Sequence, residues 1–190
     1  MEHTNFVLSG LGGQGILFMT KLMARTAVSR GLNIMVAETH GMAQRGGSVV
    51  SHLRIGDVEG SLVRAGSAHI VLSLDENEAY RNIPFLARRG RLYVNAREGA
   101  VAREEVRSYL DRMEMACHFF PASATAVALG APRSSNLALL GFFSAFQDGL
   151  MGRDGLRKTI AEVSPERFRD INLKVFDRGF QRGAGERETE

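Results

Sequence analysis

The sequence predicts a doubly wound α/β fold of the Rossmann-like class, with a mostly parallel sheet, helices on both faces and a helical C-terminal part. Three features of the chain support this prediction. A short apolar run, a glycine-rich turn and a helical pattern follow one another within residues 5–30. Further apolar runs alternate with helical segments as far as residue 120, and beyond it the apolar residues recur at helical spacing.

The composition is typical of a single globular domain. The chain has 190 residues, 44% of them hydrophobic and 24% charged, which suffices for one sizeable core and argues against disorder. We expect one domain at residues 1–183 and a polar tail at 184–190. Residues 1–5 lack the basic segment and apolar stretch of a secretory signal, so we expect a cytoplasmic protein.

Charge and cysteine content exclude several classes of function. Lys and Arg total 24 against 21 Asp and Glu, a formal charge of +3 that is dispersed, so nucleic-acid binding is not expected. The weakly charged stretch 118–147 contains Arg133 and two prolines, which argues against a membrane span. The single cysteine, Cys117, excludes an internal disulfide and an iron–sulfur cluster or cysteine-ligated zinc held by this chain alone.

The first elements form a βαβ pattern. A strand is expected at 5–9, followed by the glycine turn, a helix at 16–30 that Gly31 ends, and a second strand at 33–38. Two strands joined by a helix are expected to be parallel, with a right-handed crossover connection.

The following segments predict more strands and one helix. Residues 48–55 alternate with period two, as in a strand at an edge of the sheet or with one wet face. A buried strand is expected at 68–74, a helix at 76–87 interrupted near Pro84, and strands at 91–95 and 116–120.

Four helices complete the chain, and they are expected at 122–129, 134–150, 155–163 and 165–180. Residues 134–146 are apolar on nearly every face, so this helix must be covered. It is either a central core helix or, with Gly141, Ser144 and Ala145 beside three phenylalanines, a helix packed against another subunit.

The glycine turn is the first candidate for chemistry. Gly10, Gly12 and Gly15 have the G-x-G-x-x-G spacing between a strand and a helix, where backbone N–H groups and the helix dipole favour a phosphate. Alternatively, these glycines only permit tight packing of strand and helix. Glu38 ends the second predicted strand, where a dinucleotide-binding fold places a carboxylate that contacts ribose.

The polar, glycine-rich segment 38–48 is the second candidate. We expect it beside the glycine turn, as one wall of the crevice where open α/β sheets bind ligands. Arg45 could bind a phosphate or carboxylate or could pair with Glu38, and His40 could transfer a proton or serve as a hydrogen-bonded structural group. Lys21 either reaches back to a phosphate at the turn or lies on a solvated helix face. Metal-site, P-loop and nucleophile-elbow motifs are absent from the sequence.

Two motifs resemble those of a known family. The sequences GLGGQGIL at 10–17 and ETHGMAQRGGSV at 38–49, together with RSSN at 133–136, are similar to the gamma-type subunits of 2-oxoacid:ferredoxin oxidoreductases. Within that family the resemblance is greatest to the beta subunits of indolepyruvate ferredoxin oxidoreductases, and it covers residues 5–179.

The resemblance implies a subunit without a cofactor of its own, inactive alone, in an enzyme that oxidatively decarboxylates indolepyruvate or another aryl 2-oxoacid. Thiamine diphosphate and iron–sulfur clusters would reside on a larger partner subunit, coenzyme A would be a shared substrate, and ferredoxin would accept the electrons through the complex. The residues that it assigns to binding of a phosphate-bearing ligand are Gly10, Gly12, Gly13, Gln14, Gly15, Lys21 and Arg45. Those that it places toward the cavity or the partner are Thr39, His40, Gly41, Met42, Gln44, Gly46, Ser48 and Asn136.

Some features leave other functions open. Gly13 and Gln14 stand where related single-chain enzymes carry a more polar pair, so the phosphate could belong to another molecule. A stand-alone dinucleotide-binding oxidoreductase agrees with the glycine spacing and Glu38. A purely architectural subunit agrees with the apolar helix at 134–146.

Overall fold

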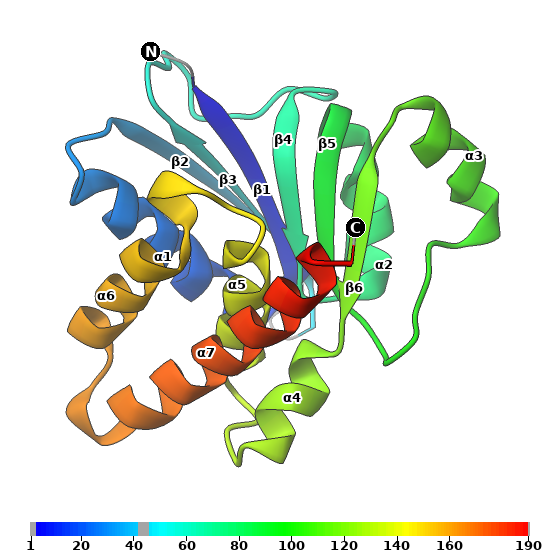
Figure 1. Cartoon of the computed structure of the whole chain (residues 1–190). Coiled ribbons are helices and arrows are strands. Elements are labelled where there is room, and N and C mark those ends of the chain that lie inside the picture. The colour runs from blue at the N-terminus through cyan, green and yellow to red at the C-terminus, as the bar shows by residue number, and fades with distance from the viewer. Residues whose placement is uncertain (1–2, 42–45, 190) are drawn as a thin grey trace.

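The computed structural model describes residues 3–41 and 46–189, which form one six-stranded sheet with helices on both faces (Figure 1). The strands are β1 (Thr4–Leu11), β2 (Ile34–His40), β3 (Ser48–Ile55), β4 (Ala68–Ser73), β5 (Leu86–Asn95) and β6 (Ala116–Phe120). The helices are α1 (Ile16–Val28), α2 (Glu76–Asn82), α3 (Glu104–Arg112), α4 (Ala122–Ala128), α5 (Ser135–Ser144), α6 (Arg153–Val163) and α7 (Glu166–Arg187), with short 3-10 turns at Ile83–Phe85 and Gly149–Met151.

The sheet is mostly parallel, as predicted, but its order differs from a simple βαβ arrangement. The strand order is β2-β3-β1-β4-β5-β6, and β1, β4, β5 and β6 are parallel. Strand β3 is antiparallel to both β1 and β2 and separates them. Of the two alternatives for residues 48–55, the edge position was therefore wrong, and the edge strands are β2 and β6. A short connection from β2 favours an antiparallel neighbour, because a parallel one would need a long crossover.

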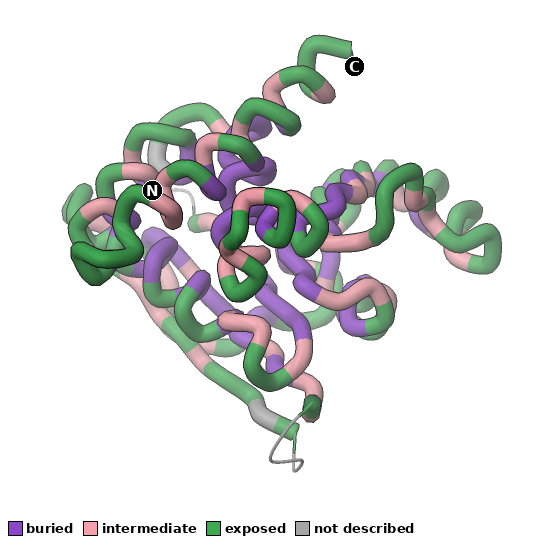
Figure 2. The backbone as a smooth tube through the Cα atoms, turned by 90° about the horizontal axis from the view of Figure 1, so that it is seen from below, coloured by how far each residue is buried: buried purple, intermediate pink, exposed green. Residues whose placement is uncertain are grey.

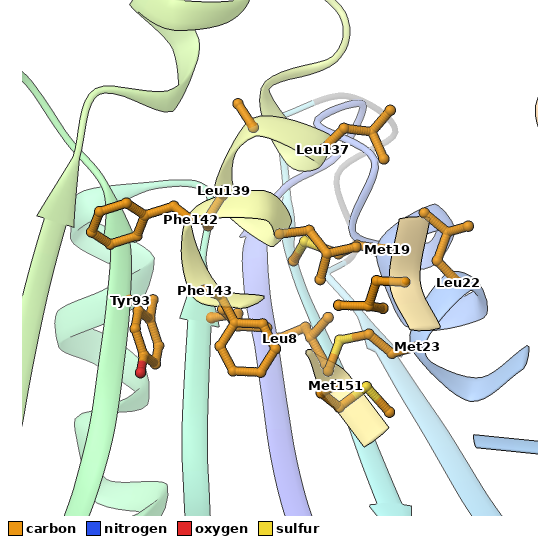
Figure 3. Close-up of a cluster of buried hydrophobic side chains, with 14 of the residues drawn as sticks. Leu8, Met19, Leu22, Met23, Tyr93, Leu137, Leu139, Phe142, Phe143 and Met151 are labelled. Carbon is orange, nitrogen blue, oxygen red and sulfur yellow. The ribbon is translucent and has the colours of Figure 1, made fainter. Parts of the chain in front are cut away.

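The two faces of the sheet carry separate hydrophobic clusters. Phe6 and Leu8 of β1 pack with residues of α1, α5, α6 and α7. Val7, which points to the opposite face, packs with Ala79 of α2 and Leu110 of α3. Figure 3 shows the larger cluster, with Leu8 among side chains from α1 and α5. Seen from below, buried segments occupy the interior and the outer helix surfaces are exposed (Figure 2). The alternation of β1 thus explains why helices cover both faces.

Helix α5 is the central core helix, covered by its own chain. Its residues from Asn136 to Ser144 are all buried, and α7 crosses directly over it (Figure 1). Glycines permit the close approach: a Cβ built on Gly141 would lie 2.0 Å from the carbonyl oxygen of Phe176, and one on Gly179 would lie 2.0 Å from that of Ala138. The core alternative for this helix is therefore confirmed, and α7 occupies the face that a second subunit was considered to cover.

Several element boundaries differ from those predicted. Helix α5 ends at Ser144 rather than 150, whereas α7 continues through Arg187 rather than ending at 180. Helix α2 ends at Asn82, and β5 begins five residues earlier than expected, at Leu86. Helix α3 was missed, although Val106, Tyr109 and Leu110 have helical spacing and pack on the sheet; only Leu110 of its nine residues is fully buried. None of the described helices is long and apolar enough to cross a membrane.

Candidate functional site

The topology places a switch point at the carboxyl ends of β1 and β4. These strands are parallel neighbours, but α1, which follows β1, covers one face of the sheet and α2, which follows β4, covers the other. Such a switch point leaves a gap between the two outgoing connections, and open α/β sheets bind ligands there. Here the two connections are the glycine turn, which leads into α1, and the start of α2, and the region between them is called the crevice.

The glycine turn has the backbone geometry that its sequence predicts. Gly13 and Gly15 have φ values of 97° and 88°, in the left-handed region that favours glycine. The side chain of Gln14 turns inward, and its Oε1 accepts a hydrogen bond from the N–H of Leu11 at 2.7 Å. A Cβ on Gly10 would lie 2.7 Å from the same oxygen. Gly10 thus has a packing role, and Gln14 braces the turn from within.

The exposed part of the turn is its middle, and its end leads into an uncapped helix. Gly12 and Gly13 are exposed. Gly15 is the N-cap of α1, without a side-chain capping bond and without an acidic residue in the first turn of the helix. The N-cap and the first turn of α1 thus supply no side chain that neutralises the positive end of the helix dipole.

Asn136, at the start of α5, lies directly beneath the turn. It is 5% exposed, its Nδ2 donates to the carbonyl oxygen of Gly15 at 3.3 Å, and its Oδ1 accepts from the N–H of Leu137 at 2.9 Å. A Cβ on Gly15 would lie 2.5 Å from Asn136 Nδ2. The structure therefore brings Asn136 to the predicted site as a support of the turn.

The second predicted loop meets the glycine turn. The N–H of Gly12 donates to the carbonyl oxygen of Gly47 at 2.8 Å, and the N–H of Gly41 donates to that of Ser48 at 2.8 Å. Thr39, Gly41 and Gly46 are exposed. Met42, Gln44 and Arg45 lie outside the described residues, as does the side chain of His40. The structure thus joins the two loops, even though β1 and β2 are not neighbours.

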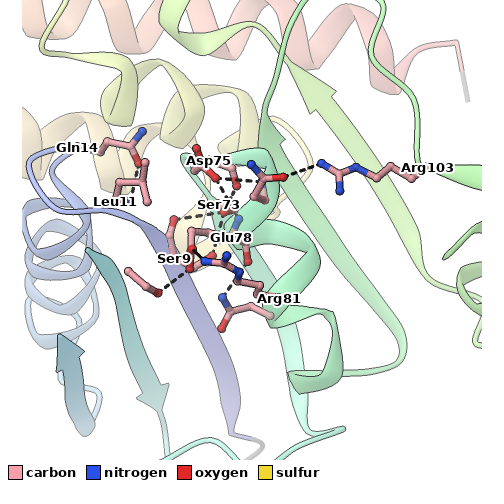
Figure 4. Close-up of polar contacts among 11 residues, drawn as sticks. Ser9, Leu11, Gln14, Ser73, Asp75, Glu78, Arg81 and Arg103 are labelled. Atoms are coloured by element: carbon pink, nitrogen blue, oxygen red, sulfur yellow. Dashed lines mark hydrogen bonds and ion pairs between the residues drawn. The ribbon is translucent and has the colours of Figure 1, made fainter. Parts of the chain in front are cut away.

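A polar network that sequence analysis did not find lies on the α2 side of the crevice (Figure 4). Ser9 Oγ donates to Ser73 Oγ at 2.9 Å. Glu78 of α2 accepts from Ser48 Oγ at 2.6 Å and from Arg81 Nη1 at 2.5 Å. In sequence, Asp75 and Glu78 have only the spacing of a helix capping box, which gives no sign of a partner 30 residues earlier.

Lys21 lies in a different part of the molecule from this network. It is exposed on α1 and lines a hollow of about 570 Å³ between α1 and the edge strand β2, together with Leu17, Phe18, Val36 and Glu38. The apolar side chains in this hollow are unusually open, with Leu17 40% and Val36 37% exposed. The hollow starts at the first turn of α1 with Leu17, and Lys21 lies one turn further along the helix, on the side that faces β2.

Glu38 is poorly placed for the role that a dinucleotide would require. In the strand register it is level with Ser51 of β3, which is level with Leu8 of β1. Two strand spacings put Glu38 roughly 10 Å to the side of β1, and three residues put Leu8 roughly 10 Å before the turn at Leu11. In a dinucleotide-binding fold the acidic residue stands on a strand next to the glycine turn. The insertion of β3 removes that relationship.

Burial favours the neutral form of two titratable side chains, Cys117 and His52. Burial, with a smaller effect from Asp111, raises the pKa of the Cys117 thiol to about 11, so this thiol is a poor nucleophile at neutral pH. Burial lowers the pKa of His52, and its Nδ1 accepts a hydrogen bond from the N–H of Val63 at 3.3 Å. Within residues 3–41 and 46–189, no three His, Cys, Asp or Glu side chains are grouped so as to hold a metal ion.

Comparison with curated proteins finds relatives of the same length. The indolepyruvate oxidoreductase subunit IorB of Archaeoglobus fulgidus is 31% identical over 196 residues, which cover 97% of this chain and 98% of that protein. The subunit of the same name from Pyrococcus horikoshii is 32% identical over 193 residues, covering 94% and 95%.

Solved structures share the fold. The gamma subunit of a keto/oxoacid ferredoxin oxidoreductase from Geobacter sulfurreducens superposes with a TM-score of 0.73 at 22% identity, covering 96% of this chain and 99% of that one. A 2-oxoglutarate:ferredoxin oxidoreductase from Magnetococcus marinus, with 2-oxoglutarate, coenzyme A and succinyl-CoA bound, gives a TM-score of 0.78 at 18% identity. There the match covers 98% of this chain and 32% of the longer one. Residues 5–182 match the model of the pyruvate ferredoxin/flavodoxin oxidoreductase family, and the chain belongs to that family.

Proposed function

We propose that this chain is the subunit without a cofactor of its own in a 2-oxoacid:ferredoxin oxidoreductase that acts on indolepyruvate or a related aryl 2-oxoacid. The observation that carries the proposal is the match, over 97% of this chain, to a protein named as a subunit of indolepyruvate oxidoreductase. The larger partner subunit would hold thiamine diphosphate for decarboxylation and iron–sulfur clusters for electron transfer to ferredoxin. Cys117 alone cannot ligate such a cluster.

In this proposal the crevice receives a phosphate group of coenzyme A. The exposed backbone of Gly13 and the uncapped start of α1 offer N–H groups and a positive dipole end to an anion, whereas the N–H of Gly12 is bonded to Gly47 and helps to shape the site. Gly10, Gln14 and Gly15 give the turn its shape, and Lys21 would add a positive charge from the β2 side. The neighbour that holds coenzyme A supports this ligand class by its shared fold.

The segment from Thr39 to Ser48 would face the shared cavity or the partner subunit. Its described ends are exposed at Thr39, Gly41 and Gly46 and are joined to the glycine turn at Gly47. We include His40, Met42, Gln44 and Arg45 in this surface on the resemblance of their sequence to the family motif.

Reconstitution tests the proposed subunit role. The chain and its larger partner are purified together, and coenzyme A-dependent reduction of a viologen dye or ferredoxin by indolepyruvate is measured with and without the chain. Activity that requires both components would support the proposal. Full activity of the partner alone, or tight dinucleotide binding by the isolated chain without a partner, would contradict it.

A single substitution tests the assignment of coenzyme A. In the reconstituted enzyme, Lys21→Ala is expected to raise the KM for coenzyme A about tenfold, the change for one lost hydrogen bond to a charged group, while the KM for indolepyruvate stays unchanged. Lys158→Ala is the matched control, because Lys158 is also an exposed helix lysine but lies on α6. Equal changes in both KM values would contradict the assignment. Unchanged kinetics for variants of both Lys21 and Arg45 would favour the purely architectural subunit.

A further inference from the structure

Glu78, in the first turn of α2, is a buried carboxylate beside the crevice. Its side chain is 1% exposed, whereas that of its partner Arg81 is 70% exposed. One oxygen accepts from Arg81 Nη1 at 2.5 Å and the other accepts from Ser48 Oγ at 2.6 Å. A buried carboxylate is unfavourable unless its oxygens are paired. The bond to Ser48 is therefore part of what makes this position tolerable for a glutamate.

Capping of α2 does not account for Glu78. Asp75 is the N-cap, and its Oδ1 accepts from the N–H groups of Asn77 at 2.9 Å and Glu78 at 3.1 Å. In a capping box the glutamate side chain would turn back to the backbone of the N-cap residue. The Glu78 carboxylate instead accepts a hydrogen bond from Ser48 of β3, so this side chain links α2 to β3.

Ser48 connects α2 to the backbone segment that contacts the glycine turn. It begins β3 opposite Leu11, and its carbonyl oxygen accepts from the N–H of Gly41 at 2.8 Å. The preceding residue, Gly47, accepts from the N–H of Gly12 at 2.8 Å. The hydrogen bond that the Ser48 hydroxyl donates to Glu78 thus fixes a backbone segment that itself contacts the exposed part of the glycine turn.

We infer that Glu78 is a positioning residue, which holds Gly47 and Ser48 against the glycine turn and thereby fixes the crevice at Gly12. The anchoring follows from the bonds within this chain. Its consequence for coenzyme A rests on the proposed function, because only there does the crevice receive the phosphate.

The anchoring is tested on the full chain by amide hydrogen exchange. Glu78→Gln and Ser48→Ala are each expected to speed exchange at the Gly12 and Gly41 amides by roughly tenfold, the change for loss of one hydrogen bond to a charged group. The Leu74 amide, bonded to Ser9 at 2.9 Å, should stay unchanged. Glu76→Gln is the matched control, since it makes the same change two residues away, at a side chain 35% exposed.

The double variant decides whether Glu78 acts through Ser48. If it does, Glu78→Gln with Ser48→Ala exchanges no faster than either single variant, whereas multiplied effects would overturn the inference. If Glu78→Gln does not fold, Ser48→Ala carries the test alone, since it leaves the buried carboxylate paired with Arg81. Unchanged Gly12 and Gly41 amides in Ser48→Ala would also overturn it.

Kinetics of the reconstituted enzyme separate the anchoring from the proposed function. Both single variants are expected to raise the KM for coenzyme A at least threefold and to leave that for indolepyruvate unchanged. Faster exchange with an unchanged KM for coenzyme A would leave the anchoring intact and overturn the role of the crevice in coenzyme A binding. A raised KM with unchanged amide exchange would overturn the positioning mechanism.

Discussion

Replacing Gly179 by alanine tests the packing of α7 on α5, on which the hydrophobic core depends. The new Cβ would lie 2.0 Å from the carbonyl oxygen of Ala138, 2.9 Å from its carbonyl carbon and 3.0 Å from the backbone nitrogen of Phe142. All three atoms belong to the backbone of a buried helix, so no side-chain rotation can relieve the contact. The helices would have to move apart by more than about 1 Å to restore ordinary contact distances of roughly 3.5 Å.

The net effect is a balance between overpacking and helix propensity. Overpacking of a dense core costs about 1–3 kcal/mol and occasionally more, and the backbone contact here places Gly179 at the upper end. Alanine gains about 1 kcal/mol over glycine inside a helix. We therefore expect Gly179→Ala to lower the free energy of unfolding by about 2 kcal/mol, which corresponds to roughly 4–8 °C in Tm for a chain of this size.

Gly185 provides the matched control on the same helix. It is exposed, and a Cβ built there would meet no heavy atom within 4 Å. Gly185→Ala should therefore raise the free energy of unfolding by about 0.5–1 kcal/mol through helix propensity alone. Urea unfolding followed by circular dichroism measures both variants. Stability equal to or above wild type in Gly179→Ala would refute the close approach of the helices, and destabilisation of Gly185→Ala would refute the helical state of the chain's end.

Three further predictions concern Asn136, Cys117 and His52. Asn136→Ala should lower the free energy of unfolding by about 0.5–1.5 kcal/mol, the net contribution of a typical hydrogen bond, because the carbonyl of Gly15 loses the Asn136 amide and keeps only its bond from the N–H of Met19; urea unfolding measures this, and wild-type stability would contradict it. Because its pKa is raised to about 11, Cys117 stays protonated in the folded state while an unfolded thiol ionises near pH 9. The free energy of unfolding should therefore fall as pH rises from about 9 to 11, and it should fall less in Cys117→Ser. Alkylation of Cys117 in the folded chain at pH 8 should be about 100-fold slower than alkylation of a model thiol. Rapid labelling of the folded chain would contradict the burial. The lowered pKa of His52 keeps it neutral when folded, so stability is lost as pH falls below its unfolded value of about 6.5, and His52→Gln should reduce that loss in unfolding measured from pH 7 to 5.

Local patterns in the sequence were sufficient for the glycine turn and the helix that follows it. Gly13 and Gly15 have positive φ values, as a tight strand-to-helix turn requires, and the apolar residues Ile16, Met19 and Met23 are all buried. The meeting of the two loops was also predictable, because β1 and β2 run in the same direction and end at the same edge of the sheet.

Non-local pairings could not be predicted in the same way. Nothing in the sequence of β3 indicates that it inserts between β1 and β2, since period-two alternation describes burial and not a choice of neighbour. Glu78 resembles a capping residue in sequence, and its partner Ser48 lies 30 residues away. Glycines within helices normally weaken them. Gly141 and Gly179 are required by the close contact between the backbones of α5 and α7, which the sequence does not reveal.

The distribution of supporting contacts around the glycine turn argues for a role beyond packing. Gln14 braces the turn from within, Asn136 supports its end from beneath, and Glu78 fixes the adjoining wall through Ser48. These three polar side chains come from three different helices or turns, yet each acts on backbone beside Gly12 and Gly13, which stay exposed. If the turn served packing alone, burial of that backbone under an apolar side chain would be more favourable than its exposure. A rigid, exposed backbone surface is instead what a ligand or partner that binds through main-chain N–H groups requires, because a preformed site avoids the entropic cost of ordering on binding.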